Sequence, residues 1–163
     1  MTRAGLAAGA AAMAWGAVAA AQSVTVTGLG GQKLQLNAAD VAALPHQPVT
    51  LQLDGGKSEA CEGAPLSAIL AKVGAPQGKA LRGPELADVV EVRAADGYRV
   101  ALALAETDPL MRPGEAFLAD RCNGAPLTAA EGPFRLIVVG DGRPARSARQ
   151  VTSIAVLRLP SGP

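Results

Sequence analysis

Aromatic side chains are almost absent from this chain. Its 163 residues include one Trp, one Tyr and two Phe, and Trp15 lies in an N-terminal apolar segment. Aromatic rings form the stacking surfaces of many carbohydrate sites and of single-stranded nucleic-acid sites, so their scarcity argues against both classes. The core must instead be built from Leu, Val, Ile and Ala, which is sufficient at this length.

Several catalytic motifs are also missing, and the chain after the N-terminal apolar segment has no net charge. Residues 22–163 contain 14 Lys and Arg against 14 Asp and Glu, and a neutral domain lacks the basic footprint of a nucleic-acid-binding protein. The one histidine, His46, cannot form a common zinc site without other ligands, and no Gly-x-Ser-x-Gly elbow accompanies it. We interpret His46, between Pro45 and Gln47, as an exposed loop residue. The glycine turns match neither a Walker loop nor a dinucleotide-binding fingerprint.

The N-terminus has the features of a secretory signal peptide. A cationic start at residues 1–3 precedes an apolar run over residues 4–18, and Ala19-Ala20-Ala21 forms an Ala-x-Ala site. We expect cleavage after Ala21, which leaves one domain over residues 22–163. The run is shorter than the roughly 20 residues of a membrane span, although an uncleaved anchor is an alternative. The expected location is the periplasm or the medium of a bacterium, with no membrane attachment after cleavage.

Hydrophobic periodicity predicts an α+β fold, mostly antiparallel β with a few short helices. Asn37 is a good N-cap for a helix over residues 38–43, and Pro65 suits the start of a second helix whose apolar stripe includes Leu66 and Ile69. Asp96-Gly97 predicts a hairpin turn. The expected strands are residues 24–27, 33–36, 50–53, 57–61, 89–93, 99–104, 117–120, 134–139 and 151–159.

Cys61 and Cys122 are the only cysteines. An even number in an exported chain favours a disulfide between them. One residue separates each cysteine from a Gly-Ala-Pro-Leu segment, so the two have similar local sequence. Free thiols are an alternative. A redox-active pair is a further one, but no Cys-x-x-Cys spacing is present to lower a thiol pKa.

The strongest candidate site is a basic loop near the C-terminus. Arg143, Arg146 and Arg149 recur every three residues. In the surrounding region, residues 132–163, Asp141 is the only acidic residue. Guanidinium groups bind phosphate and carboxylate through paired hydrogen bonds, so this loop is a candidate anion site. The alternative is that these arginines form salt bridges or are solvated.

Two carboxylates near the end of an expected strand, Glu106 and Asp108, could act as an acid and a base. No convergent partner is visible in the sequence, and we interpret them as surface or capping residues.

Four segments in a fixed order carry a resemblance to a known family. Together with Gly63-Ala64-Pro65-Leu66, they resemble the oxidoreductase molybdopterin-binding domain, the fold of the sulfite oxidase family, and more closely its small secreted members. The resemblance extends from about Leu51 to Leu159. The segments are residues 86–100, 118–127, 132–141 and 146–154.

The resemblance implies a sulfite oxidase-type fold and molybdopterin as the class of cofactor. In the family a basic-Ser-x-basic loop helps to hold the pterin and its phosphate, which here corresponds to Arg146-Ser147-Ala148-Arg149. The family's Asp-Gly-Tyr lines a cleft, so Tyr98 joins Arg143, Arg146, Ser147 and Arg149 as a candidate cofactor-binding residue; packing on the apolar face of the sheet is its alternative role.

The resemblance also bears on the metal. Full-length family members bind molybdenum through one cysteine, which lies well upstream of the Gly-x-Pro-Leu helix. Cys61 adjoins that helix instead, so it corresponds to the bulky residue before the helix, and a molybdenum-ligand role for it is the less favoured interpretation.

Three functions remain open from the sequence. The favoured one is an exported module that lacks the metal-binding cysteine and binds a small anion, a cofactor or a periplasmic protein partner. The second is an active molybdopterin oxidoreductase. The third is a disulfide-stabilised structural or interaction domain.

Overall fold

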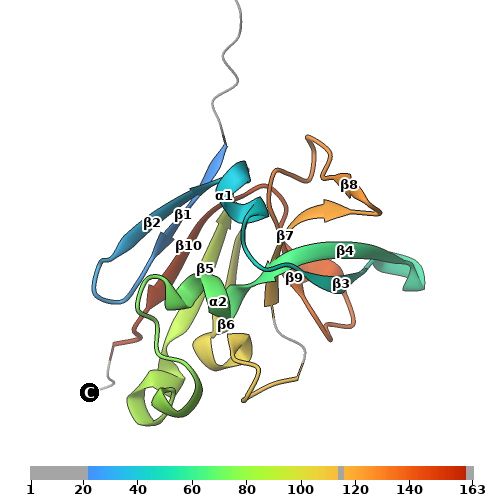
Figure 1. The fold of residues 1–163 in the computed structure, drawn as a ribbon. Coiled ribbons are helices and arrows are strands. Elements are labelled where there is room, and N and C mark those ends of the chain that lie inside the picture. Colours follow the sequence, from blue (N-terminus) through green and yellow to red (C-terminus); the bar gives the residue numbers. More distant parts are fainter. Residues whose placement is uncertain (1–21, 114–115, 161–163) are drawn as a thin grey trace, which may run out of the picture.

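The computed structural model describes residues 22–113 and 116–160. They form two β-sheets and several short helices (Figure 1). The predicted signal peptide, residues 1–21, lies outside the described residues. Within the described ranges, no helix has the length and apolar character needed to cross a membrane.

The first sheet has five strands in the order β2-β1-β10-β5-β6. β1 and β10 pair in parallel, and the other pairs are antiparallel. The predicted Asp96-Gly97 turn joins β5 to β6, with Gly97 at a φ of 87° that favours glycine. The strands are β1 (Ser23–Thr27), β2 (Lys33–Asn37), β5 (Val89–Ala94), β6 (Arg99–Ala103) and β10 (Val151–Leu157).

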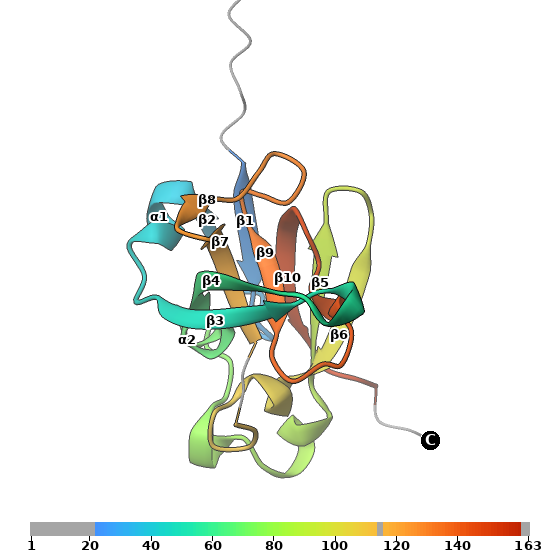
Figure 2. The ribbon, with the colours of Figure 1, turned by 90° about the vertical axis from the view of Figure 1, so that its right-hand side faces the viewer.

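The second sheet is antiparallel and is centred on β7. One edge of β7 pairs with β4, which pairs in turn with β3, and the other edge pairs with β8 and β9. The β3–β4 hairpin crosses in front of β7 and β9 in Figure 2, and β3 also contacts β9, so the sheet curls. The strands are β3 (Gln47–Gln52), β4 (Ser58–Pro65), β7 (Ala116–Cys122), β8 (Ala125–Pro126) and β9 (Arg135–Val138).

The helices are short and begin where the sequence predicts. Asn37 caps α1 (Ala38–Ala42) and forms a capping box with Asp40. Helix α2 (Leu66–Ala71) follows Pro65 directly and buries its apolar stripe. The 3₁₀ helices are η1 (Asp54–Gly56), η2 (Gly78–Ala80), η3 (Gly83–Ala87), η4 (Leu104–Thr107) and η5 (Pro144–Arg146).

Two apolar clusters are buried, one on each face of the second sheet. The larger cluster lies between the sheets and includes Leu118 of β7 and Ile154 of β10. The smaller cluster occupies the inner side of the curl and includes Phe117. Phe117 precedes Leu118 on β7, so its side chain projects from the opposite face of the strand. The second sheet is therefore apolar on both faces along β7.

The predicted α+β class and its antiparallel character are confirmed. The strand expected over residues 57–61 is longer, however, because the second half of β4 continues through Gly63 to Pro65 while it pairs with β7. A Cβ atom at Gly63 would lie 2.8 Å from the Cα atom of Ala119, so only glycine allows this approach. The sequence could not indicate this close contact.

Candidate functional site

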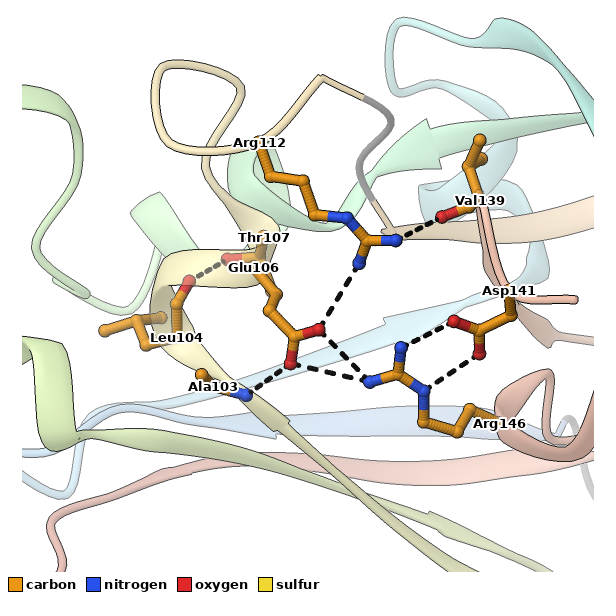
Figure 3. A network of polar contacts seen from close by, with 8 residues as sticks. All are labelled: Ala103, Leu104, Glu106, Thr107, Arg112, Val139, Asp141 and Arg146. Carbon is orange, nitrogen blue, oxygen red and sulfur yellow. Dashed lines mark hydrogen bonds and ion pairs between the residues drawn. The ribbon is translucent and has the colours of Figure 1, made fainter.

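Arg146 lies in a network of four charged side chains (Figure 3). Its Nε and Nη2 atoms donate to both carboxylate oxygens of Asp141, at 2.8 and 2.6 Å, and its Nη1 donates to Glu106 at 3.2 Å. Arg112 donates to Glu106 at 3.3 Å and to the carbonyl of Val139 at 2.7 Å. Two cations and two anions thus neutralise one another, and the Arg146 guanidinium is already occupied.

The two carboxylates considered as an acid and a base are capping residues. Glu106 accepts a hydrogen bond from the backbone N–H of Ala103 at 2.9 Å, besides its contacts with the arginines. Asp108 is buried and accepts from the backbone N–H groups of Gly78 and Leu110. These hydrogen bonds join the segment after β6 to its neighbours, which is a structural role.

Three of the five predicted cofactor-binding residues line one pocket. Tyr98, Ser147 and Arg149 lie around a surface pocket with a volume of about 260 Å³, between the β5–β6 turn and the segment that contains η5. Arg146 is turned toward Asp141, and Arg143 is exposed and does not line this pocket. The remaining lining residues are Ala94, Asp96, Pro144, Ala145 and Ala148.

The polar groups of this pocket have different roles. The hydroxyl of Tyr98 donates to the carbonyl of Ala145 at 2.7 Å, so it holds the loop in place. Ser147 is buried, and its hydroxyl oxygen accepts from the backbone N–H of Val138 at 3.3 Å, so it ties the loop to β9. Arg149 is exposed and makes no hydrogen bond or ion pair within the part of the chain that the structure describes. It is the uncompensated cation of the pocket.

A buried arginine that the sequence pattern did not single out lies nearby. The side chain of Arg135 is 2 % exposed and donates to Glu131, while its Nε atom has no hydrogen-bond partner among the described residues. Burial lowers the pKa of Arg135, the charge of Arg149 lowers it further, and Glu131 and Glu59 oppose the shift. Arg135 therefore lies within electrostatic reach of both Glu59 and Arg149.

Cys61 and Cys122 form the predicted disulfide. They are direct partners across β4 and β7, with Cα atoms 3.9 Å apart. The sulfur of Cys61 is bonded to Cys122 and is not a thiolate, so the residues present do not fit a molybdenum ion held by Cys61.

His46 lies on a loop, as predicted, but the prediction that it is exposed is wrong. Its side chain is 14 % exposed, and its Nε2 atom lies 3.2 Å from Oδ1 of Asp120, without hydrogen-bond geometry. Its Nδ1 atom lies 2.7 Å from the carbonyl oxygen of Leu44 and must donate to it, because a carbonyl only accepts. His46 thus links the start of β3 to β7, and nothing in the surrounding Pro-His-Gln-Pro sequence indicated this contact.

Stability should decrease in acid because two carboxylates titrate below their ordinary values. The hydrogen bond from Arg146 lowers the pKa of Asp141 below its ordinary 3.8, and those from Arg99 and then Arg93 lower the pKa of Glu91 below 4.5. Their stabilisation is complete above the unfolded-chain pKa and is lost as the pH falls through the folded value. We expect the midpoint temperature of thermal unfolding to decrease as the pH is lowered below about 4.5. In Asp141→Asn this decrease should be shallower. An unchanged slope in that variant would contradict the assignment.

Comparison with known proteins supports the fold. No family model matches the sequence, and no curated protein matches it. Among solved structures, the sulfane dehydrogenase SoxCD from Paracoccus pantotrophus matches with a TM-score of 0.64 and 19 % sequence identity. The match covers 84 % of this chain and 38 % of that chain, so this chain spans well under half of its structural neighbour. The chain therefore has an α+β, sulfite oxidase-type fold like that of part of this sulfane dehydrogenase.

Proposed function

We propose that this protein is an exported binding module of sulfite oxidase-type fold that holds a small anion in the pocket beside Tyr98. The observation that carries the proposal is the uncompensated guanidinium of Arg149 at a pocket of about 260 Å³. Ser147, which is largely buried, also lines this pocket and carries a hydroxyl group. Guanidinium donors suit an oxyanion such as phosphate or sulfate.

The charge of the pocket limits its affinity. Asp96 also lines it and accepts a hydrogen bond from the backbone N–H of Tyr98 at 2.8 Å. This carboxylate repels an anion bound at Arg149, and the site is open to water, so we infer weak and salt-sensitive binding. Charge changes at these two residues should therefore have opposite effects.

The proposal is tested by titrating inorganic phosphate and sulfate into the protein. We expect Arg149→Ala to weaken binding about tenfold, as for the loss of one charge-assisted hydrogen bond. Asp96→Asn should tighten binding, because the amide oxygen can still accept from the Tyr98 N–H while the negative charge is removed. Backbone NMR shifts of the pocket residues would report binding at low affinity.

Arg143→Ala is the matched control, since it removes an exposed arginine of the same segment that lies outside the pocket lining. Equal losses in Arg143→Ala and Arg149→Ala would indicate a general charge effect and contradict the assigned pocket. Absence of binding to the native protein would favour the disulfide-stabilised interaction domain with a protein partner instead.

An active molybdopterin oxidoreductase is the less favoured function. The disulfide occupies the sulfur of Cys61, and the ion network occupies Arg146, one of the two basic residues of the family-like Arg-Ser-x-Arg pattern. The disulfide also supports an extracellular or periplasmic location.

A further inference from the structure

The disulfide has a carboxylate beside it. Glu59 lies two residues before Cys61 on β4, so both side chains project from the same face of the strand. One carboxylate oxygen of Glu59 and the sulfur atoms of Cys61 and Cys122 all lie within 4.8 Å of one another. When the disulfide is intact, these three residues offer a metal ion one carboxylate ligand. When it is reduced, they offer two thiolates and a carboxylate.

We propose that reduction of the Cys61–Cys122 disulfide creates a binding site for a thiophilic divalent cation of the zinc class, with Glu59 as the third protein ligand. The site is distinct from the anion pocket. Two sulfur ligands and one oxygen ligand are a donor set that zinc accepts, and three protein ligands leave a fourth tetrahedral position for water.

The spacing of the strands suits this geometry. Two thiolates bound to one tetrahedral zinc lie roughly 3.8 Å apart, given zinc–sulfur bonds of about 2.3 Å. Cys61 and Cys122 are direct cross-strand partners, and such partners carry neighbouring side chains on one face of a sheet. Rotation of the two side chains after reduction can therefore provide this separation without moving either strand.

The charge around the site also suits a bound cation. Two thiolates and one carboxylate exceed the charge of a divalent cation by one. Arg135, which pairs with Glu131, is close enough for Glu59 to raise its pKa, so a positive charge lies in the surroundings of the site. In the oxidised protein the two sulfur atoms carry no negative charge, so they do not attract a metal ion.

The reduction step needs a dithiol reductant, and Cys122, at the end of β7, is the less buried of the two cysteines. A thiolate of the reductant attacks the Cys122 sulfur, the disulfide bond breaks, and Cys61 leaves as a thiolate. The second reductant thiol then displaces Cys122, so the reductant becomes a disulfide and two electrons reach the protein. The cysteines take up two protons from the reductant thiols and release them when the cation binds.

The test is a cobalt titration of the full chain in both redox states, followed by displacement with zinc. Cobalt(II) reports thiolate ligands through sulfur-to-metal charge-transfer absorption and reports tetrahedral geometry through its visible bands. We expect one ion per reduced chain and none per oxidised chain. Glu59→Gln should weaken binding by about tenfold or more, because one of three protein ligands is lost. A reduced, folded chain that shows no charge-transfer band would overturn the proposal.

Glu62→Gln is the matched control, because Glu62 lies on the same strand and is exposed. Equal weakening by both variants would remove Glu59 from the site and overturn the proposal. If reduction unfolds the chain, zinc is added to the reduced chain and circular dichroism is recorded. Recovery of the native spectrum in wild type but not in Glu59→Gln would support the site, and no recovery in wild type would overturn it.

Discussion

Removal of the Cys61–Cys122 disulfide should lower the free energy of unfolding by about 4 kcal/mol. The cysteines are 61 residues apart, and a cross-link that closes a loop of this length restricts the unfolded chain by about that amount on the chain-entropy account. The measurement is equilibrium urea unfolding of the oxidised protein and of the double variant Cys61→Ala/Cys122→Ala. We expect a much lower midpoint for the variant.

The reduced wild-type protein in a metal chelator separates the covalent bond from the side-chain volume. It retains both sulfur atoms in the smaller apolar cluster, so it should lose nearly as much stability as the double variant. If the reduced protein instead unfolds at the same urea concentration as the oxidised protein, the disulfide does not stabilise the fold by restricting the unfolded chain.

Arg146→Ala should lower the free energy of unfolding by about 2 kcal/mol, less than for a fully buried ion pair because Arg146 is about one third exposed. The substitution removes both hydrogen bonds that Asp141 accepts from this guanidinium and one partner of Glu106. Asp141 would remain partly buried with an uncompensated charge. Thermal and urea unfolding would measure the loss.

Arg143→Ala provides the comparison, because Arg143 is exposed on the same loop and makes no contact of this kind among the described residues. Its effect should stay within about 0.5 kcal/mol. If Arg146→Ala proved equally harmless, Arg146 would be a solvated residue and its guanidinium would again be available for an anion.

Local patterns predicted the fold better than they predicted the site. Alternating Val and Thr residues indicated β1, and Asn37 indicated the start of α1, because these signals act over a few residues. The disulfide was predicted from cysteine number and compartment. Its structural basis, the direct pairing of Cys61 with Cys122, depends on strands far apart in sequence that no local signal could place together.

The arginine loop shows the same limit. A repeat of three residues suggested one basic surface, but η5 turns Arg146 toward Glu106, which lies 40 residues earlier in the chain. Arg149 instead reaches the pocket beside Tyr98. Which arginine is neutralised depends on a tertiary contact, so spacing alone could not separate the structural arginine from the candidate binding residue.

The register of β7 against β4 is not set by an alternation of apolar and polar residues. In most sheets the alternation of apolar and polar residues records the register, since a slip by one residue would expose the apolar set to water. Residues 116–119 are buried on both faces of β7, so such a slip would exchange one apolar face for another. The register is instead marked by Cys61, bonded to the end of β7, and by Gly63, where the backbones approach closely. The placement of β7 is therefore encoded largely in two residues of its neighbour, β4.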